Sequence, residues 1–193
     1  MKILLETERL ILRQFTENDL ENLYNLDNDP DVVRLASRTG QPTEYTVIKT
    51  ETLPKILEYY QRFPNFGCWA AIEKSSNEFI GWFLFRPNVD NLVINPGEVE
   101  LGYRLKKSAW GKGYGTEGAK ALIYKGFTEL NVESVAATSL IANTASIRVM
   151  EKVGLKLEKY FTETRYLGGS QEAVKYSLHK SQFLLSAKTT EKY

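Results

Sequence analysis

The stretch that decides the fold is EVELGYRLKKSAWGKGYGTEGAKALIYKGFTEL, which runs from Glu98 to Leu130. In its first part apolar and polar side chains alternate, as in a strand, with the apolar ones at Val99, Leu101, Tyr103 and Leu105. In its last part apolar residues recur every three or four positions, as in an amphipathic helix, at Ala119, Leu122, Ile123, Gly126, Phe127 and Leu130. The stretch therefore predicts a strand, a loop and a helix.

The loop between them is rich in glycine and reads Trp110-Gly111-Lys112-Gly113-Tyr114-Gly115-Thr116. Glycine lets the backbone turn tightly, so that consecutive N–H groups point at one spot. The positive end of the dipole of the following helix also attracts an anion. The loop is therefore a predicted anion site, suited to a phosphate-bearing cofactor. The alternative is that the glycines only turn a corner between the strand and the helix.

A dinucleotide-binding fold is a competing interpretation of the same glycines. The pattern G-x-G-x-x-G occurs at Gly113, Gly115 and Gly118. In that fold the strand runs almost directly into the first glycine, whereas here residues 106–112 intervene. The acidic residue that should end the next strand is also misplaced, because Glu133 precedes the strand predicted from Ser134 to Thr138. A nucleotide-dependent oxidoreductase is thus the weaker alternative.

A second informative segment, NTASIRVMEKVG, runs from Asn143 to Gly154 and comes one strand after the glycine loop. Its residues predict a short helix that Asn143 caps and that Gly154 ends in a left-handed conformation. An ordinary capped helix would explain these two residues, but not the position of the segment after the loop.

The two segments together resemble the GNAT superfamily of N-acetyltransferases. The acetyl-CoA motif of that superfamily is a strand, Gln/Arg-x-x-Gly-x-Gly/Ala, and a helix; here Trp110 replaces the usual Gln or Arg. The second CoA motif, Asn-x-x-Ser-x-x-(Val/Leu)-x-Glu-Lys-x-Gly, matches residues 143–154. The segment Thr7–Arg13, TERLILR, and the Gly-Tyr-x-Leu that begins at Gly102 resemble the RimJ/RimL-type branch.

The resemblance implies an α/β (α+β) fold class, the GNAT fold, with a central, mixed, mostly antiparallel twisted sheet of about seven strands flanked by helices. Residues 1–180 are expected to form a single domain, and residues 181–193 a C-terminal surface helix or tail. Hydrophobic patterns outside the motifs predict strands at 4–14, 68–74, 79–85, 155–161 and 173–178, a helix at 47–62 with a possible break at Pro54, and a loop at 88–97.

The resemblance also implies direct transfer of acetyl from acetyl-CoA, the cosubstrate, to the primary amine of a small molecule or a protein N-terminus, without a metal. The edge of the strand at Tyr103, Arg104 and Leu105 is expected to pair with the pantetheine arm, and Asn143 to hydrogen bond to that arm. The backbone amides expected to hold the pyrophosphate are those of Gly111, Lys112, Gly113, Tyr114, Gly115 and Thr116.

Two residues are catalytic candidates. Glu100 matches the family's strand-borne glutamate and would take the proton of the acceptor amine through a water; the alternative is a salt-bridged or solvated strand residue. Many relatives carry a tyrosine in the second motif that protonates the leaving thiolate, but here Met150 occupies that position. Ser146 is the expected substitute, unless its hydroxyl only bonds the backbone of its own helix.

Amino-acid composition excludes several other classes of protein and of partner. The 193 residues are 42% hydrophobic, enough for one core, and the net charge of +1 indicates no nucleic-acid partner. One cysteine, Cys68, excludes an intrachain disulfide, and one histidine, His179, argues against a Ser/His/Asp triad. The chain has neither a signal-peptide pattern at its start nor an apolar run of about 20 residues, so we expect a cytoplasmic monomer or homodimer with no membrane partner. A non-catalytic acyl-CoA-binding protein of the same fold is the alternative function.

Overall fold

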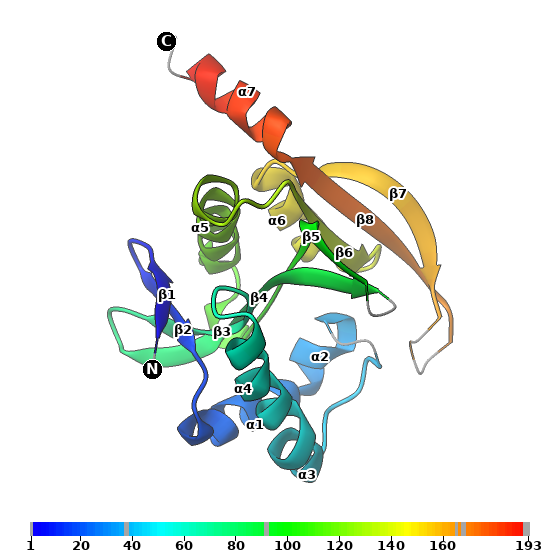
Figure 1. Cartoon of the computed structure of the whole chain (residues 1–193). Helices are drawn as coiled ribbons and strands as arrows, with labels where there is room; N and C mark the ends of the chain where they lie inside the picture. Colours follow the sequence, from blue (N-terminus) through cyan, green and yellow to red (C-terminus); the bar gives the residue numbers. More distant parts are fainter. Residues whose placement is uncertain (1, 37–38, 91–92, 165, 167–168, 191–193) are drawn as a thin grey trace.

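The computed structural model describes residues 2–36, 39–90, 93–164, 166 and 169–190. Within these residues one sheet of eight strands forms the centre, in the order β1-β2-β3-β4-β5-β6-β8-β7 (Figure 1). All neighbouring strands are antiparallel except β5 and β6, which are parallel. The strands are β1 (Ile3–Glu6), β2 (Leu10–Gln14), β3 (Gly67–Glu73), β4 (Glu78–Asp90), β5 (Val93–Leu105), β6 (Ser134–Leu140), β7 (Lys156–Glu163) and β8 (Gln171–His179).

The helices lie on both faces of this sheet (Figure 1). They are α1 (Leu20–Asp27), α2 (Pro30–Ala36), α3 (Tyr45–Val47), α4 (Leu53–Arg62), α5 (Tyr114–Glu129), α6 (Thr144–Lys152) and α7 (Lys180–Thr190). Shorter turns are η1 (Glu17–Asp19), the π-helical η2 (Ile48–Thr52) and η3 (Lys107–Ala109). The predicted mixed, mostly antiparallel GNAT-type sheet is thus confirmed, with eight strands rather than about seven.

The eighth strand arises at the amino terminus, where one strand was expected from residue 4 to 14. A turn divides that segment into β1 and β2, which pair with each other. The Thr7 N–H donates to the Leu10 carbonyl at 2.9 Å, and the Leu10 N–H donates to Thr7 Oγ1 at 2.9 Å. The threonine hydroxyl therefore closes a turn that hydrophobic alternation alone does not reveal.

The prediction of a loop at residues 88–97 is wrong. β4 continues to Asp90 and β5 begins at Val93, so the two strands form a long hairpin. Their register shifts between Pro87 and Val89, which accommodates an irregularity without ending the pairing. Cross-strand hydrogen bonds outweigh the turn preference of the asparagine, proline and glycine residues in this segment.

Helix α2 is not among the elements predicted above, and it begins within Asn28-Asp29-Pro30. The same residues end α1 at Asp27 and start α2 at Pro30. Proline is favoured in the first turn of a helix, where its missing N–H is not needed. Asp29 Oδ1 accepts hydrogen bonds from the Asp31 N–H at 2.9 Å and the Val32 N–H at 3.4 Å, so it caps the new helix.

Two other predicted helices are confirmed in outline. The segment expected at residues 47–62 is helical, but the chain does not break at Pro54, because the π-helical η2 runs directly into α4, with Pro54 in the first turn of α4. Asn143 caps α6, and Gly154 follows it with φ of +93°. The tail expected from residue 181 is the helix α7, whose Phe183 ring lies 5.2 Å from that of Phe127 in α5.

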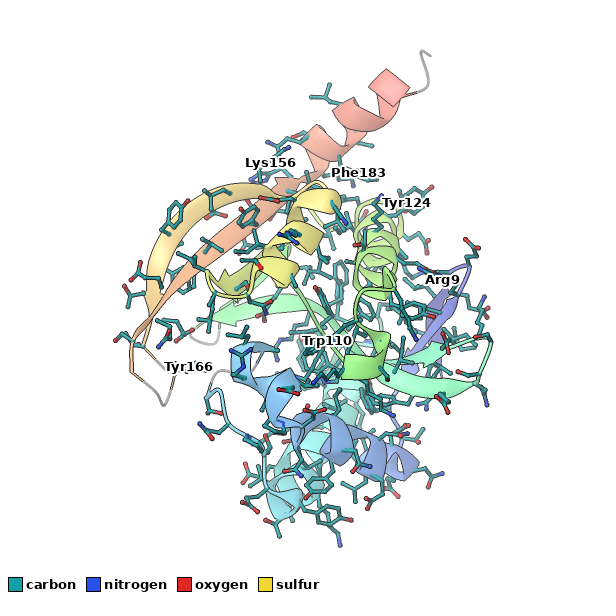
Figure 2. The ribbon with its side chains drawn as sticks, turned by 180° about the vertical axis from the view of Figure 1, so that it is seen from behind. Arg9, Trp110, Tyr124, Lys156, Tyr166 and Phe183 are labelled. Atoms are coloured by element: carbon teal, nitrogen blue, oxygen red, sulfur yellow. The ribbon has the colours of Figure 1, made fainter. Side chains whose placement is uncertain are left out.

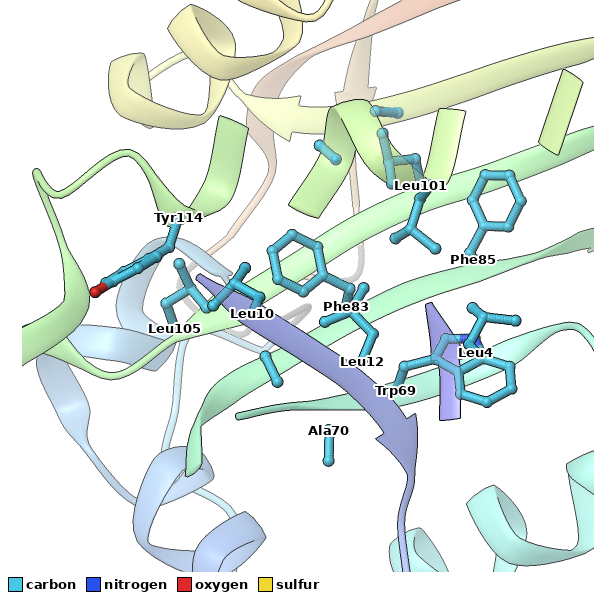
Figure 3. Close-up of a cluster of buried hydrophobic side chains, with 14 of the residues drawn as sticks. Leu4, Leu10, Leu12, Trp69, Ala70, Phe83, Phe85, Leu101, Leu105 and Tyr114 are labelled. Atoms are coloured by element: carbon cyan, nitrogen blue, oxygen red, sulfur yellow. The ribbon is translucent and has the colours of Figure 1, made fainter. Parts of the chain in front are cut away.

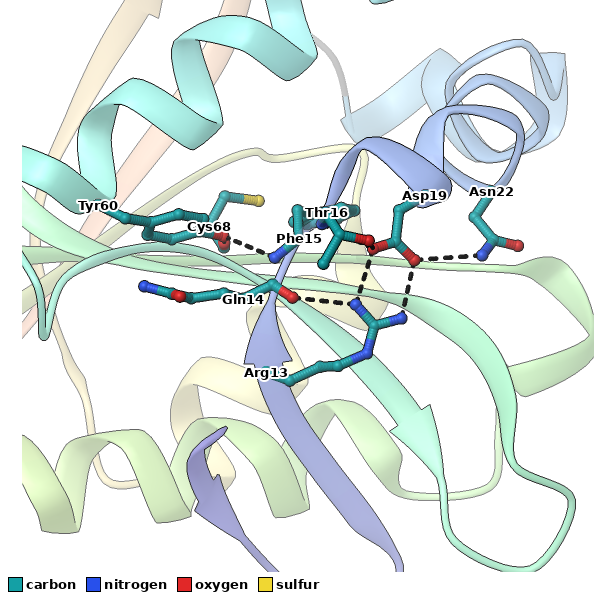
Figure 4. Close-up of polar contacts among 8 residues, drawn as sticks. All are labelled: Arg13, Gln14, Phe15, Thr16, Asp19, Asn22, Tyr60 and Cys68. Carbon is teal, nitrogen blue, oxygen red and sulfur yellow. Dashed lines mark hydrogen bonds and ion pairs between the residues drawn. The ribbon is translucent and has the colours of Figure 1, made fainter. Parts of the chain in front are cut away.

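The turn between β2 and α1 is fixed by a buried ion pair (Figure 4). Arg13 donates to both carboxylate oxygens of Asp19, at 2.7 and 2.8 Å, and the Thr16 N–H donates to the same carboxylate at 2.8 Å. Burial would raise the pKa of Asp19, but the bonds from Arg13 and Thr16 outweigh it and hold that pKa below its usual value. The phenol of Tyr60 in α4 bonds the Cys68 carbonyl and the Phe15 N–H, which joins α4 to β3 at this place.

Glycines in α5 let this helix lie close to the aromatic rings of β4 (Figure 3). A Cβ atom at Gly118 would lie 2.3 Å from the Phe83 ring, and one at Gly126 would lie 2.6 Å from the Phe85 ring. Both rings are fully buried between the sheet and α5. Arg104 of β5 instead reaches Asp27 of α1, so α1 lies on the face opposite α5. Among the described residues, no helix has the length and apolar character that a bilayer crossing needs.

Candidate active site

The parallel strands β5 and β6 separate after a short paired segment. They pair only where Glu98–Glu100 faces Ser134–Ala136. β5 then continues to Leu105 beside β4, and β6 continues to Leu140 beside β8. In the described part of the chain no strand pairs with this second edge of β5 from Leu101 onward, so its backbone groups are available to an extended ligand.

Two adjoining cavities lie where the strands separate. The first, here called the strand cavity, has a volume of about 650 Å³ and is lined by residues that include Arg86, Glu100 and Thr138. The second, the loop cavity, has a volume of about 450 Å³ and is lined by the glycine loop, with Gly111, Gly113, Gly115 and Thr116. Tyr103, Arg104, Asn143 and Ser146 line both cavities. The structure thus brings most of the predicted site residues around these two adjoining cavities.

The glycine loop has the conformation that an anion site needs. Gly111 and Gly113 have φ of +74° and +85°, in the left-handed region, and α5 starts at the next residue, Tyr114. The N-terminus of this long helix carries free N–H groups and the positive end of the helix dipole. Trp110, at the position where relatives have Gln or Arg, donates its indole N–H to the Leu105 carbonyl at 2.8 Å. It therefore attaches the loop to the end of β5.

A residue that the sequence did not point to, Arg9, holds the loop from the other side (Figure 2). Arg9 Nη1 donates to the Lys112 carbonyl at 2.9 Å, and its Nε and Nη2 atoms contact Glu117 Oε2 at 2.7 and 2.5 Å. Its guanidinium lies 4.5 Å from the centre of the Tyr114 ring. The phenol of Tyr114 bonds Glu73 of β3. The loop is thereby tied to β2 and β3 before any ligand binds.

Glu100 lies on β5 directly opposite Arg86 of β4. Arg86 Nε and Nη2 both contact Glu100 Oε2, at 3.4 and 3.3 Å. Glu100 is therefore in an ion pair, as one sequence interpretation held, and it also lines the strand cavity, as the catalytic interpretation requires. The structure makes the two interpretations compatible.

Ser146 lies in the first turn of α6 and, like Tyr103, lines both cavities. Burial raises the pKa of Tyr103, and the Ser146 side chain acts in the opposite direction. The Ser146 backbone N–H donates to Asn143 Oδ1 at 3.2 Å. Two hydroxyl-bearing side chains, Ser146 and Tyr103, thus line both cavities, and either can supply a proton.

Arg104 and Asn143 use their side chains within the protein. Arg104 Nη1 contacts Asp27 Oδ1 at 2.6 Å, and its guanidinium lies 5.1 Å from the Trp82 ring. Asn143 accepts from Ser146 and donates Nδ2 to the Leu35 carbonyl at 3.4 Å. The backbone of Arg104 on the open edge of β5 is what remains for the contact predicted with a pantetheine arm.

Helix α2 ends on residues of the site. Its last carbonyls accept from three side chains: Arg34 from the Tyr166 phenol at 2.5 Å, Leu35 from Asn143, and Ala36 from Arg104 Nη2 at 2.7 Å. Carbonyls at a helix C-terminus lack partners within the helix, so these bonds satisfy them. α2 thereby joins β5, α6 and the β7–β8 connection around both cavities.

Comparisons with known proteins agree with this geometry. The sequence profile of the family "Acetyltransferase (GNAT) domain" matches residues 9–156. The chain is 30% identical over 187 residues to the FsC-acetyl coenzyme A-N(2)-transacetylase of Aspergillus fumigatus, which covers 93% of this chain and 77% of that protein.

Two solved structures share the fold. An acetyltransferase (GNAT family) from Bacillus anthracis superposes with a TM-score of 0.76 and 23% identity, over 94% of this chain and 99% of that one. RimL, a ribosomal alpha-N-protein acetyltransferase in complex with coenzyme A, superposes with a TM-score of 0.77 and 19% identity, over 92% and 98%. Given the family profile and the fungal relative, the chain belongs to the GNAT acetyltransferase family, whose members use acetyl-CoA.

Proposed function

We propose that this protein is an acetyl-CoA-dependent N-acetyltransferase that moves the acetyl group directly to a primary amine. The observation that carries the proposal is the separation of β5 from β6, which surrounds one space with the glycine loop, Glu100 and Ser146. The sequence of residues 7–13 supports membership of the RimJ/RimL-type branch.

The residues present fit acetyl-CoA as the cosubstrate. The loop amides from Gly111 to Thr116 would hold its pyrophosphate, and the open edge of β5 at Tyr103–Leu105 would pair with the pantetheine arm. Asn143 can exchange its long contact with Leu35 for a contact with that arm. When bound, acetyl-CoA supplies an activated acyl group as a thioester.

Glu100 prepares the amine. An ammonium group cannot attack a carbonyl, so the acceptor must lose a proton, and an α-amine with pKa ~8 or a lysine with pKa ~10.4 is mostly protonated at neutral pH. Both Arg86 contacts go to Oε2, and within the described residues Oε1 makes no hydrogen bond. Oε1 is therefore the proposed acceptor of that proton, through a water.

Ser146 and Tyr103 act on the leaving sulfur. A thiol with pKa ~8.5 is a tolerable leaving group, so donation of a proton is helpful rather than essential. Ser146 would give its proton to the sulfur, and the Tyr103 phenol, which lines the same cavities, would return a proton to Ser146. This assigns to Ser146 the role that the absent tyrosine at Met150 has in relatives.

The test is an acceptor panel with purified protein and acetyl-CoA, in which free thiol is measured and the acetylated amine is identified by mass spectrometry. We expect thiol release that depends on an added amine and falls in Glu100→Gln. Binding of acetyl-CoA without consumption of any amine would instead identify a non-catalytic acyl-CoA-binding protein.

A further inference from the structure

The strand cavity contains an ion pair that is easy to separate. Arg86 and Glu100 meet only through Glu100 Oε2, at 3.3 and 3.4 Å, and their side chains are 36% and 28% exposed. Half-exposed pairs with long contacts contribute little net stability, because water solvates both charges nearly as well. Each group can therefore exchange its partner for a ligand group at a small free-energy cost.

The other ion pair of this cavity is fixed. Arg104 and Asp27 are about one-tenth exposed and lie 2.6 Å apart, and Arg104 also donates to the Ala36 carbonyl. The described lining includes one further carboxylate, Glu163, which is also engaged. A polycationic acceptor needs a lining with more carboxylates than positively charged side chains. In the described lining of this cavity every carboxylate already has a partner. Arg86 and Glu100 are thus the two charges that are exchangeable, one of each sign.

A third group lies within electrostatic reach of the same pair. The hydroxyl of Tyr59 in α4 is buried and has no hydrogen-bond partner among the described residues. Burial raises the pKa of Tyr59, the positive charges of Arg86 and Arg62 lower it and the negative charge of Glu100 raises it. Tyr59 is not among the residues that line the strand cavity, so the ligand contacts fall to Arg86 and Glu100.

We propose that the acceptor is a free α-amino acid or a close analogue, with a carboxylate next to its amine. The ammonium group would pair with Glu100 and the carboxylate with Arg86, so that one internal ion pair is replaced by two intermolecular ones. One proton then passes from the ammonium through a water to Glu100 Oε1, which frees the nitrogen lone pair. The inference rests on the proposed function, and it disfavours polyamines and ordinary protein N-termini, which lack that carboxylate.

The experiment compares three acceptors for each of several side chains: the amino acid, its carboxamide and the amine without the carboxyl group. Rates are expressed per neutral amine, because loss of the carboxylate changes the amine pKa. For the wild type we expect kcat/KM to favour the amino acid by about 10- to 100-fold, the range for a hydrogen-bonded charge. Arg86→Gln should abolish this preference and Arg86→Lys should keep part of it. Tyr59→Phe changes a residue outside the lining of the strand cavity and should leave the preference unchanged.

The matched control is Arg62→Gln, which removes a positive charge from the end of α4, where the guanidinium lies over the Phe63 ring and does not line the strand cavity. It should leave the preference unchanged. Equal rates for the three acceptors in the wild type, or an equal loss for all three in Arg86→Gln, would overturn the inference while leaving the transferase function intact.

Binding supplies a separate measurement. Calorimetric titration of the CoA-loaded wild type should show tighter binding of the amino acid than of its carboxamide, and Arg86→Lys tests this if Arg86→Gln does not fold. Absence of thiol release with every amine, together with selective amino-acid binding, would refute the transferase function and retain the ligand class. Indifference to the carboxylate in both measurements would refute the ligand class.

Discussion

Replacing Arg9 with methionine should loosen the glycine loop and weaken acetyl-CoA binding. The substitution keeps an apolar stem but removes the bond to the Lys112 carbonyl and both contacts with Glu117. Each charge-assisted bond is worth about 1.5–3 kcal/mol when buried, but the Arg9 side chain is 42% exposed and solvent screens it. We therefore expect the free energy of unfolding to fall by about 1–2 kcal/mol.

The loss of CoA affinity in Arg9→Met should be larger than a less ordered loop alone would cause. Without Arg9, Glu117 in the first turn of α5 becomes an unpaired negative charge beside the proposed pyrophosphate site. We expect the Kd for CoA to rise about tenfold, equivalent to ~1.4 kcal/mol. Calorimetry and urea unfolding of Arg9→Met, Glu117→Gln and the double variant form the assay. In the double variant CoA affinity should partly recover, because the unpaired charge is gone.

Unchanged CoA affinity in Arg9→Met, or losses that simply add in the double variant, would refute this reasoning. The pH dependence of stability provides an internal check of this reasoning. Burial would raise the pKa of Glu117, but bonds from Thr7 and Arg9 outweigh it and hold that pKa below its usual value. A carboxyl with a lowered pKa stabilises the fold above its unfolded pKa of ~4.3, and this stabilisation disappears as pH falls through the folded value. The stability difference between wild type and Arg9→Met should therefore shrink below about pH 4.

Five further substitutions test the proposed roles. Gly113→Val places a branched side chain at φ of +85° in the loop cavity and should nearly abolish CoA binding, as measured by calorimetry. In Gly111→Ala the new Cβ, at φ of +74°, has no atom within 4 Å. This variant should lose about 1–2 kcal/mol of stability and less CoA affinity than Gly113→Val. Glu100→Gln should lower turnover about 10²–10⁴-fold at neutral pH, and turnover should recover in part at high pH, where more of the amine is neutral. Wild-type rates in this variant across the pH range would show that Glu100 is not the general base. Ser146→Ala should lower turnover less than Glu100→Gln does, and Tyr103→Phe should lower it less than Ser146→Ala does. In a steady-state assay, an acyl donor with a more acidic thiol should reduce both losses of turnover. A loss that does not depend on the donor would contradict proton donation to sulfur.

The two motifs predicted much of the fold because their signals are local. The alternation from Val99 to Leu105, the glycines of the loop and the caps of α6 each depend on residues close in sequence, and the structure has these elements where the patterns indicated. α2 was missed because a proline that ends one helix can equally begin the next. The extent of β4 and β5 was missed because strand pairing, not local preference, decides it.

The site was less predictable, because its polar contacts join distant segments. Arg9 and Glu117 are 108 positions apart, and Arg104 and Asp27 are 77 positions apart. Neither pair produces a pattern within a sequence window. The opposition of Arg86 and Glu100 depends on the register of the β4–β5 hairpin, part of which was expected to be a loop. The sequence thus identified residues that line the cavities but not the contacts that orient them.

The C-terminal end of α2 has a consequence for how this protein could change during evolution. Leu35 and Ala36 line both cavities, and the carbonyls of α2 hold Tyr166, Asn143 and Arg104. Backbone carbonyls cannot be removed by mutation, so these three anchors persist whatever side chains α2 carries. A mutation that shifts the helix, however, moves the walls of both cavities together. New acceptor preferences should therefore arise more readily through side chains on β4 and β7, which alter one cavity and leave the other in place.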